Sequence, residues 1–135
     1  MTDYKEKVQL FTEEVWRNKN FQVFEKMIHH NFEYNDPVAF NVKTKKDYKA
    51  FASGIQSRNP DMTYDVLDII AERNKVVVLY SFSGTPLTDP TGAPLNGIKI
   101  EHKGVAIYYF ENDTIMKIWD VWDMYGVLKQ LGKIP

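Results

Sequence analysis

The chain has 135 residues, no cysteine, and 17 basic against 18 acidic residues, for a formal net charge of −1. This balance gives no electrostatic support for a nucleic-acid or membrane-surface partner, and the lack of cysteine excludes disulfides, thiol catalysis and cysteine-ligated metals. The length suits a single domain, residues 1–135, with a substantial core. No apolar run reaches transmembrane length and the N-terminus lacks a signal-peptide core, so we expect a cytoplasmic protein.

The first half of the chain predicts three helices and no strand. Apolar residues at helical spacing indicate an amphipathic helix over residues 2–16. Asn20 can cap a second helix, which carries apolar residues as far as Ile28. Thr44, followed by Asp47 three residues later, resembles a capping box at the start of the third helix.

From residue 61 onward the apolar residues change to a period of two, which predicts strands. The four expected antiparallel strands are residues 62–70, 75–83, 98–110 and 114–122. The stretch Gly84–Gly97 between them is rich in proline and glycine, and loops of this length are often lids or binding loops. Helical spacing returns after the last strand, so the order of elements predicts an α+β domain with a short C-terminal helix.

The Asn112-Asp113 pair suits a two-residue turn before the last strand. With only these two turn residues, simple pairing places His102 opposite Asp123. The same pairing puts Tyr108 and Trp119 on the face that carries this pair. Asp120 would then lie on the opposite face, where it would be a solvated acid or lie at a dimer interface.

Five segments occur in the order and spacing of a known family: EEVWRNKNF, FEYNDP, FSGTPLTDPTGAPLNG, FENDTI and WDVWDMYGVLKQLG. Through them the chain resembles the SnoaL-like polyketide cyclases, a family within the cone-shaped folds similar to nuclear transport factor 2. The resemblance implies a cone-shaped, curved antiparallel sheet wrapped by N-terminal helices around an apolar pocket. It also implies a small-molecule ligand, no metal or organic cofactor, and a homodimer.

The resemblance assigns a chemical role to Asp123, because an aspartate near the end of the last strand acts as acid/base in the aldol closure of such cyclases. Residue type and position support a second interpretation, in which Asp123 caps the C-terminal helix and has a lowered pKa. His102 is the second catalytic candidate, as a proton relay or a group that orients Asp123. By residue type alone, a half-exposed strand histidine is the favoured alternative for His102.

Four residues are candidates for substrate binding: Asn35, Tyr34, Tyr108 and Trp119. Asn35 could hydrogen-bond a carbonyl or enolate oxygen, or simply belong to the turn before Asp36-Pro37. The tyrosines and Trp119 could form the pocket wall or the core. The three histidines show no metal-ligand spacing, so no metal site is expected.

Two functional hypotheses follow. The first is an enzyme that holds an enolisable carbonyl compound and catalyses an intramolecular aldol cyclisation or isomerisation through Asp123. The second is a non-catalytic binding module of the same fold, favoured by Ala106 and Pro86, which stand where family members often carry polar residues. Epoxide hydrolysis is a further possibility within the enzyme class, but the sequence supplies no evident second acid for it.

Overall fold

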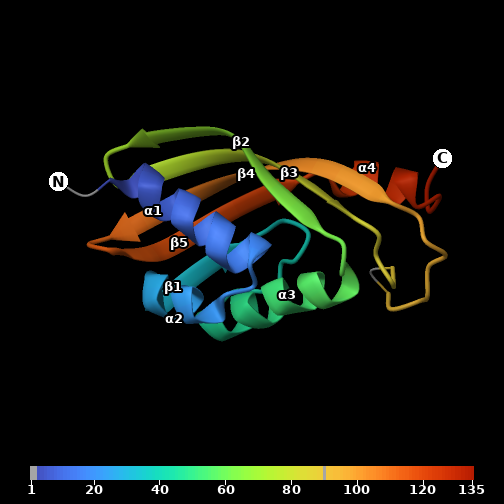
Figure 1. Ribbon diagram of the computed structural model, residues 1–135, viewed down its shortest axis with the longest axis horizontal. Coiled ribbons are helices and arrows are strands. Elements are labelled where there is room, and N and C mark those ends of the chain that lie inside the picture. Colours follow the sequence, from blue (N-terminus) through green and yellow to red (C-terminus); the bar gives the residue numbers. More distant parts are fainter. Residues whose placement is uncertain (1–2, 90) are drawn as a thin grey trace.

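The computed structural model describes residues 3–89 and 91–135. Its helical elements are α1 (Tyr4–Phe11), the π-helix η1 (Thr12–Arg17), α2 (Phe21–Met27), α3 (Lys45–Arg58) and α4 (Met124–Gln130). Its strands are β1 (Ile28–Asn35), β2 (Thr63–Glu72), β3 (Lys75–Gly84), β4 (Ile100–Glu111) and β5 (Thr114–Trp122). The strands form one sheet in the order β1-β5-β4-β3-β2 (Figure 1).

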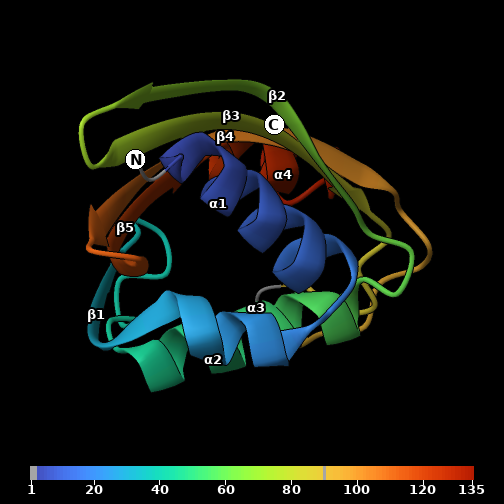
Figure 2. The same cartoon turned by 60° about the vertical axis from the view of Figure 1, so that its left-hand side comes forward.

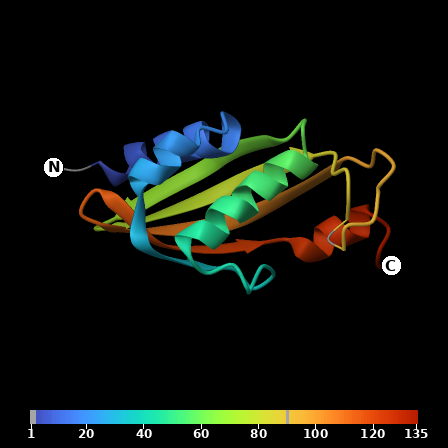
Figure 3. The ribbon, with the colours of Figure 1, turned by 90° about the horizontal axis from the view of Figure 1, so that it is seen from below.

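The sheet curves into an arch, and the helices of the first half of the chain cover its concave side. Figure 2 shows α1 inside the arch, with α2 and α3 crossing below it. Figure 3 shows α4 beside the loop of residues 85–99, at the end of the sheet away from the N-terminus. The predicted α+β class, the helical wrapping and the short C-terminal helix are therefore confirmed. No helix in the described ranges has the length and apolarity needed to cross a membrane.

The predicted helix caps are confirmed. The Asn20 side chain accepts a hydrogen bond from the backbone N–H of Gln22 at the start of α2. At α3, the Thr44 hydroxyl accepts from the N–H of Asp47, and the Asp47 carboxylate accepts from the N–H of Thr44, both at 3.1 Å. These reciprocal bonds satisfy N–H groups that have no partner within the helix.

The predicted first helix changes character where it approaches the sheet. Its second half is the π-helix η1, whose wider turn leaves a backbone carbonyl available: Gln56 Nε2 donates to Val15 O at 2.7 Å. The same turn directs Trp16 inward, where its indole stacks on Tyr64 with ring centroids 5.6 Å apart. This local irregularity therefore places an aromatic side chain against the interior of the arch.

The sequence patterns did not predict strand β1. The second helix ends at Met27, and β1 begins at Ile28 and pairs in parallel with β5, so the sheet is mixed rather than wholly antiparallel. Strand β1 buries Phe32 and Tyr34 at alternate positions. Its histidines and other polar residues face outward and mask the period of two in so short a segment.

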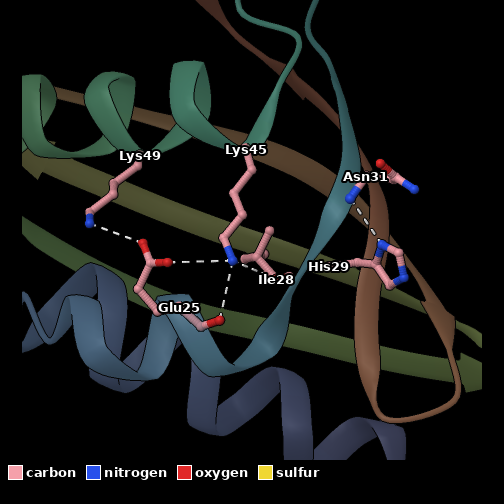
Figure 4. Close-up of polar contacts among 6 residues, drawn as sticks. All are labelled: Glu25, Ile28, His29, Asn31, Lys45 and Lys49. Atoms are coloured by element: carbon pink, nitrogen blue, oxygen red, sulfur yellow. Dashed lines mark hydrogen bonds and ion pairs between the residues drawn. The ribbon is translucent and has the colours of Figure 1, made fainter.

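Polar contacts hold the α2–β1 corner against α3 (Figure 4). Lys45 Nζ donates to the backbone oxygens of Glu25 at 3.2 Å and Ile28 at 2.9 Å, where the helical hydrogen-bond pattern ends. Lys49 Nζ forms an ion pair with Glu25 Oε1 at 3.0 Å. The corner thereby fixes α3 beside β1, and both elements border the site described below.

The predicted register of the last hairpin was wrong, although its turn was correct. Glu111 pairs with Thr114 as expected, and Asn112 has a positive φ of 54°. A β-bulge follows, because Phe110 pairs with Ile115 but Tyr109 pairs with Lys117. The extra residue, Met116, moves every later residue of β5 by one position and exchanges its two faces.

The bulge decides which end-of-strand residues face the helices. Asp120 lies opposite Ala106 and Trp122 lies opposite Gly104, so both point to the concave side. Trp119 pairs with Ile107 and points to the convex side, where it is 41% exposed. The predicted pairing of His102 with Asp123 does not occur.

Candidate functional site

A pocket of about 490 Å³ lies between the concave face of the sheet, α3, the loop of residues 85–99 and α4. Its wall is mainly aromatic and aliphatic: Trp16, Tyr34, Val42, Phe51, Ile55, Tyr64, Tyr80, Phe82, Ile100, Trp122, Met124, Val127 and Leu131 all contribute. A mostly apolar wall with a few polar groups is typical of small-molecule sites. The predicted apolar pocket is thus present, and the loop and the C-terminal helix form part of its wall.

Asp120, on β5, is one of two acids that line this pocket; the other is Asp89 in the loop of residues 85–99. The Tyr80 hydroxyl, from two strands away, donates a hydrogen bond to Asp120 Oδ1 at 2.7 Å. Burial raises the pKa of Asp120 to about 7, and the nearby charge of Asp36 adds to the rise, while the Tyr80 hydrogen bond opposes it. A carboxyl group of this kind is half protonated near neutral pH, as acid/base chemistry requires.

A second carboxylate, Asp36, lies behind Asp120 and is 5% exposed. The Tyr34 hydroxyl stands between them, 3.1 Å from Asp36 Oδ2 and 3.4 Å from Asp120 Oδ2. Trp122 Nε1 donates to Asp36 Oδ2 at 3.0 Å. The end of β5 and the end of β1 therefore share one polar cluster at the pocket wall, which the parallel pairing of these strands brings together.

The phenols of this cluster are held in the neutral form. Burial and the charge of Asp120 raise the pKa of both Tyr34 and Tyr80 far above the usual tyrosine range. Both hydroxyls consequently remain hydrogen-bond donors at any pH at which Asp120 titrates.

His102 also faces the pocket. Its ring stacks on Phe82 at 5.1 Å and lies 5.2 Å from the Trp122 ring. Desolvation lowers the pKa of His102, so its imidazole is neutral at neutral pH. Its Nδ1 atom is buried and has no hydrogen-bond partner among the described residues.

Hydrogen bonds and an ion pair of Asp89 hold the loop of residues 85–99 at the pocket. The Thr91 hydroxyl donates to Asp89 Oδ1 at 2.6 Å, the Ala93 N–H donates to the same oxygen, and Lys133 Nζ lies 3.2 Å from Oδ2. These contacts, led by the Thr91 hydroxyl, hold the pKa of Asp89 below its ordinary value. The ion pair links the loop to the chain segment that follows α4.

The structure brings two of the six predicted site residues, His102 and Tyr34, to the pocket. Asp123 is exposed and does not belong to the pocket wall: its Oδ1 accepts from the N–H of Gly126 at 2.8 Å and caps α4. The structure therefore shows Asp123 as the N-terminal cap of α4, as its residue type and position had suggested. Because Asp123 lies outside the pocket wall, its acid/base role stays a prediction from the family resemblance.

The other three predicted residues also lie outside the pocket wall. Asn35 Nδ2 donates to Glu33 Oε2 at 2.9 Å, beside the edge of β1. Tyr108 is fully buried in the core against Phe11, and Trp119 points to the convex face. The bulge accounts for Trp119, because the expected register had assigned this residue to the pocket side.

The residues that the sequence reasoning missed are Asp120, its partner Tyr80 and the buried Asp36. Two signals could have revealed Asp120. The β-branched residues Ile115 and Ile118 are three positions apart in the sequence, which breaks the period of two and indicates a bulge. The unbulged register would also have turned Lys117 toward an apolar pocket, where an unpaired charge is costly.

Within residues 3–89 and 91–135, no group of three histidine, aspartate or glutamate side chains could hold a metal ion. The acids of the cluster are instead bound by phenols, an indole and backbone N–H groups. The site therefore offers proton transfer and hydrogen bonding from its own side chains.

Comparison with known proteins places this geometry in a family. A family model described as SnoaL-like polyketide cyclase matches residues 6–131. Among solved structures, a protein from Acidithiobacillus ferrooxidans proposed to be a polyketide cyclase is 26% identical, with a TM-score of 0.79 over 97% of this chain and 95% of that one. No curated protein matches the chain in sequence.

Two further structures share the fold at lower identity. TsrD from Streptomyces laurentii has a TM-score of 0.84 at 21% identity, over 99% of this chain and 100% of that one. A SnoaL-like polyketide cyclase from Agrobacterium tumefaciens has a TM-score of 0.81 at 18% identity, over 98% and 100% of the two chains. Since the family model covers nearly the whole sequence, this chain belongs to the SnoaL-like polyketide cyclase family.

Proposed function

We propose that the protein binds a small enolisable carbonyl compound in its pocket and transfers a proton through Asp120. The reaction class is an intramolecular aldol cyclisation or a related isomerisation. One observation carries the proposal: a carboxyl group with a pKa of about 7 faces a mostly apolar pocket and is held by the Tyr80 hydroxyl. Asp123, the residue indicated by family resemblance, serves in this proposal as the cap of α4.

The proton balance of an aldol closure suits a single carboxyl group. Ionised Asp120 removes a proton from the carbon beside one carbonyl, which leaves an enolate and a neutral Asp120. The enolate carbon then attacks a second carbonyl of the same molecule, and the resulting alkoxide takes the proton back from Asp120. A pKa near the working pH makes both half-steps accessible to one group.

The enolate oxygen needs a hydrogen-bond donor in a site from which water is largely excluded. His102 is the sequence candidate that lies at the pocket, and its neutral ring carries one N–H for this purpose. Asn35 does not take this role in the proposal, because its amide is engaged with Glu33 at the edge of β1.

Exchange of carbon-bound hydrogen tests the proposal without knowledge of the natural substrate. The protein would be incubated in D2O with a bicyclic enolisable ketone, 2-tetralone, and deuterium uptake beside the carbonyl followed by NMR. We expect catalysed exchange that Asp120→Asn abolishes and the exposed-acid control Asp123→Asn retains. Exchange that survives in Asp120→Asn, or binding of the ketone without any catalysed exchange, contradicts the proposal; the second result favours a binding module.

We also propose that the protein forms a homodimer through the convex face of the sheet. Val105, Trp119 and Val121 are 41%, 41% and 53% exposed there. Val105 pairs with Val121 across β4 and β5, and Ile107 pairs with Trp119, so these side chains form adjacent rows. Ile118 and Trp122 do not belong to this face, because the bulge turns both of these to the concave side.

A further inference from the structure

Asp36 is bound almost entirely by groups that can only donate. Its Oδ1 accepts from the backbone N–H groups of Val38 at 2.8 Å and Ala39 at 3.1 Å. Its Oδ2 accepts from Trp122 Nε1 at 3.0 Å. Because an N–H group cannot act as an acceptor, these three contacts fix Asp36 as the acceptor in the cluster.

Tyr34 has one proton to share between two carboxyl groups. Its hydroxyl is 3.1 Å from Asp36 Oδ2 and 3.4 Å from Asp120 Oδ2, and the residue is 1% exposed. The shorter contact and the fixed acceptor character of Asp36 direct the Tyr34 proton to Asp36. The Tyr34 oxygen then faces Asp120 as an acceptor, and the remaining contact is filled only if Asp120 carries a proton on Oδ2.

We propose that Asp36 is a positioning residue that acts through Tyr34 to hold the proton of neutral Asp120 on Oδ2, in the form of the acid that returns a proton to the alkoxide. Oδ1 of Asp120 is then the oxygen that accepts from Tyr80. Every polar contact in the cluster has one donor and one acceptor in this arrangement. With both carboxylates ionised, two oxygen atoms would face Tyr34 with a single proton between them, which is costly in a buried site.

Among the described residues, no charged group other than Asp36 raises the pKa of Asp120. The phenols coupled to it come from five elements besides its own strand, and burial raises the pKa of each: Tyr34 from β1, Tyr48 from α3, Tyr64 from β2, Tyr80 from β3 and Tyr108 from β4. His102 on β4 is kept neutral by desolvation. Arg58 and Asp89 also line the pocket, and Asp89 is paired with Lys133. Among the charges, Asp36 is the one that raises the pKa of Asp120, in addition to burial.

A double-mutant cycle read by carboxyl-carbon NMR titration of Asp120 tests the proposal. We expect Asp36→Asn to lower the proton affinity of Asp120 at least fivefold, because a neutral amide is a weaker acceptor than the carboxylate and leaves the Tyr34 proton free for the Asp120 carboxylate. In the Tyr34→Phe background the same substitution should lower the affinity clearly less, because only the direct effect of the Asp36 charge remains there. A fivefold loss in both backgrounds would show that Asp36 acts by its field alone, and no loss in either would show that it does not act; both overturn the proposal.

Tyr34→Phe alone keeps the test decisive if Asp36→Asn does not fold, because this variant retains all three N–H contacts of Asp36. We expect it to lower the proton affinity of Asp120, since the neutral acid loses its acceptor. A rise would mean that Tyr34 donates to ionised Asp120, and would overturn the proposal. The control Tyr64→Phe, another buried pocket tyrosine, should change the affinity less than twofold.

The inference rests on the proposed function in one respect only: the proposed function says that the proton on Asp120 is transferred to the substrate. The NMR titration needs no substrate, whereas the proposed function is tested by hydrogen exchange in 2-tetralone. Coupling between Asp36, Tyr34 and Asp120 without catalysed exchange would therefore contradict the proposed function and leave the inference standing. Catalysed exchange without this coupling would contradict the inference and leave the proposed function standing.

Discussion

The side chain of Tyr80 on β3 reaches across Gly104 on β4 to donate its hydrogen bond to Asp120 on β5. Tyr80 and Gly104 are direct cross-strand partners. A Cβ added at Gly104 would lie 2.5 Å from Cζ of the Tyr80 ring. The absence of a side chain at Gly104 is thus what allows two residues on non-adjacent strands to meet at the pocket.

Gly104→Ala should separate Tyr80 from Asp120. Overpacking of this buried contact should cost about 1–3 kcal/mol of unfolding free energy. The pKa of Asp120 should rise above about 7, because the carboxylate loses the hydrogen bond that stabilises its charged form. Denaturant unfolding and NMR titration would measure the two effects.

Gly54→Ala on α3 is the matched control for this substitution. The added Cβ would meet only the end of the flexible Arg58 side chain, at 3.3 Å. Alanine also favours the helical backbone, so stability should be unchanged or higher. Gly104→Ala behaving like Gly54→Ala, with Asp120 titrating as in the unmodified protein, would refute the role assigned to Gly104.

Asp120 should make the stability of the protein depend on pH in a defined direction. Burial raises its pKa from 3.8 to about 7, so the folded state keeps a proton in this window that the unfolded chain releases. The folded state therefore loses stability relative to the unfolded chain as pH rises through the window.

Replacement of the acid by an amide removes this loss. From about pH 4 to about pH 8, the stability of Asp120→Asn relative to the unmodified protein should increase by about 4 kcal/mol. Urea unfolding of both proteins at the two pH values measures the difference. A relative stability that is constant or falls with pH would mean that burial does not raise the pKa of Asp120.

Asp123→Ala should act on α4 and leave the proton-transfer chemistry in place. The carboxylate caps the helix through the N–H of Gly126, and loss of such a cap costs about 1 kcal/mol. Asp123→Ser, which can still cap, should recover most of the stability. Thermal unfolding measures the cap, and loss of hydrogen exchange in Asp123→Ser at temperatures where the protein is folded would return the catalytic role to Asp123.

A charge placed in the centre of the convex face should prevent the proposed dimer. Val121→Lys puts an ammonium group among exposed apolar side chains that would be buried between two copies, which costs free energy on association. Analytical ultracentrifugation should show two chains for the unmodified protein and one for the variant. Lys46→Glu on α3 serves as a surface control, and a monomeric unmodified protein would contradict the proposal.

Most helices and strands of the fold could be predicted from local sequence signals. Asn20 and the Thr44-Asp47 pair mark helix starts, and each forms its cap in the structure. The predicted last strand, residues 114–122, has the bounds of β5. The strand at Ile28–Asn35 was missed because its partner β5 is distant in sequence, and a short polar-faced segment shows little periodicity alone.

The candidate site was harder to predict because it depends on one inserted residue. The bulge at Met116 leaves only the three-residue spacing of Ile115 and Ile118 as a sequence signal, yet it decides whether Asp120 or Trp119 faces the pocket. The partners of Asp120 could not be predicted either, since Tyr80 contacts it across an intervening strand and Asp36 contacts it only through Tyr34. These contacts are set by tertiary geometry, for which residue type and spacing give no direct evidence.

The most direct test of Asp120 as the proton-transfer group is a carboxyl-carbon NMR titration of the unmodified protein, with the Asp120 resonance identified by its loss in Asp120→Asn. A midpoint of about 7 is predicted, because burial in the pocket wall outweighs the Tyr80 hydrogen bond. A midpoint at the ordinary aspartate value of about 3.9 would contradict it, since such a carboxylate is too weak a base to remove a carbon-bound proton efficiently.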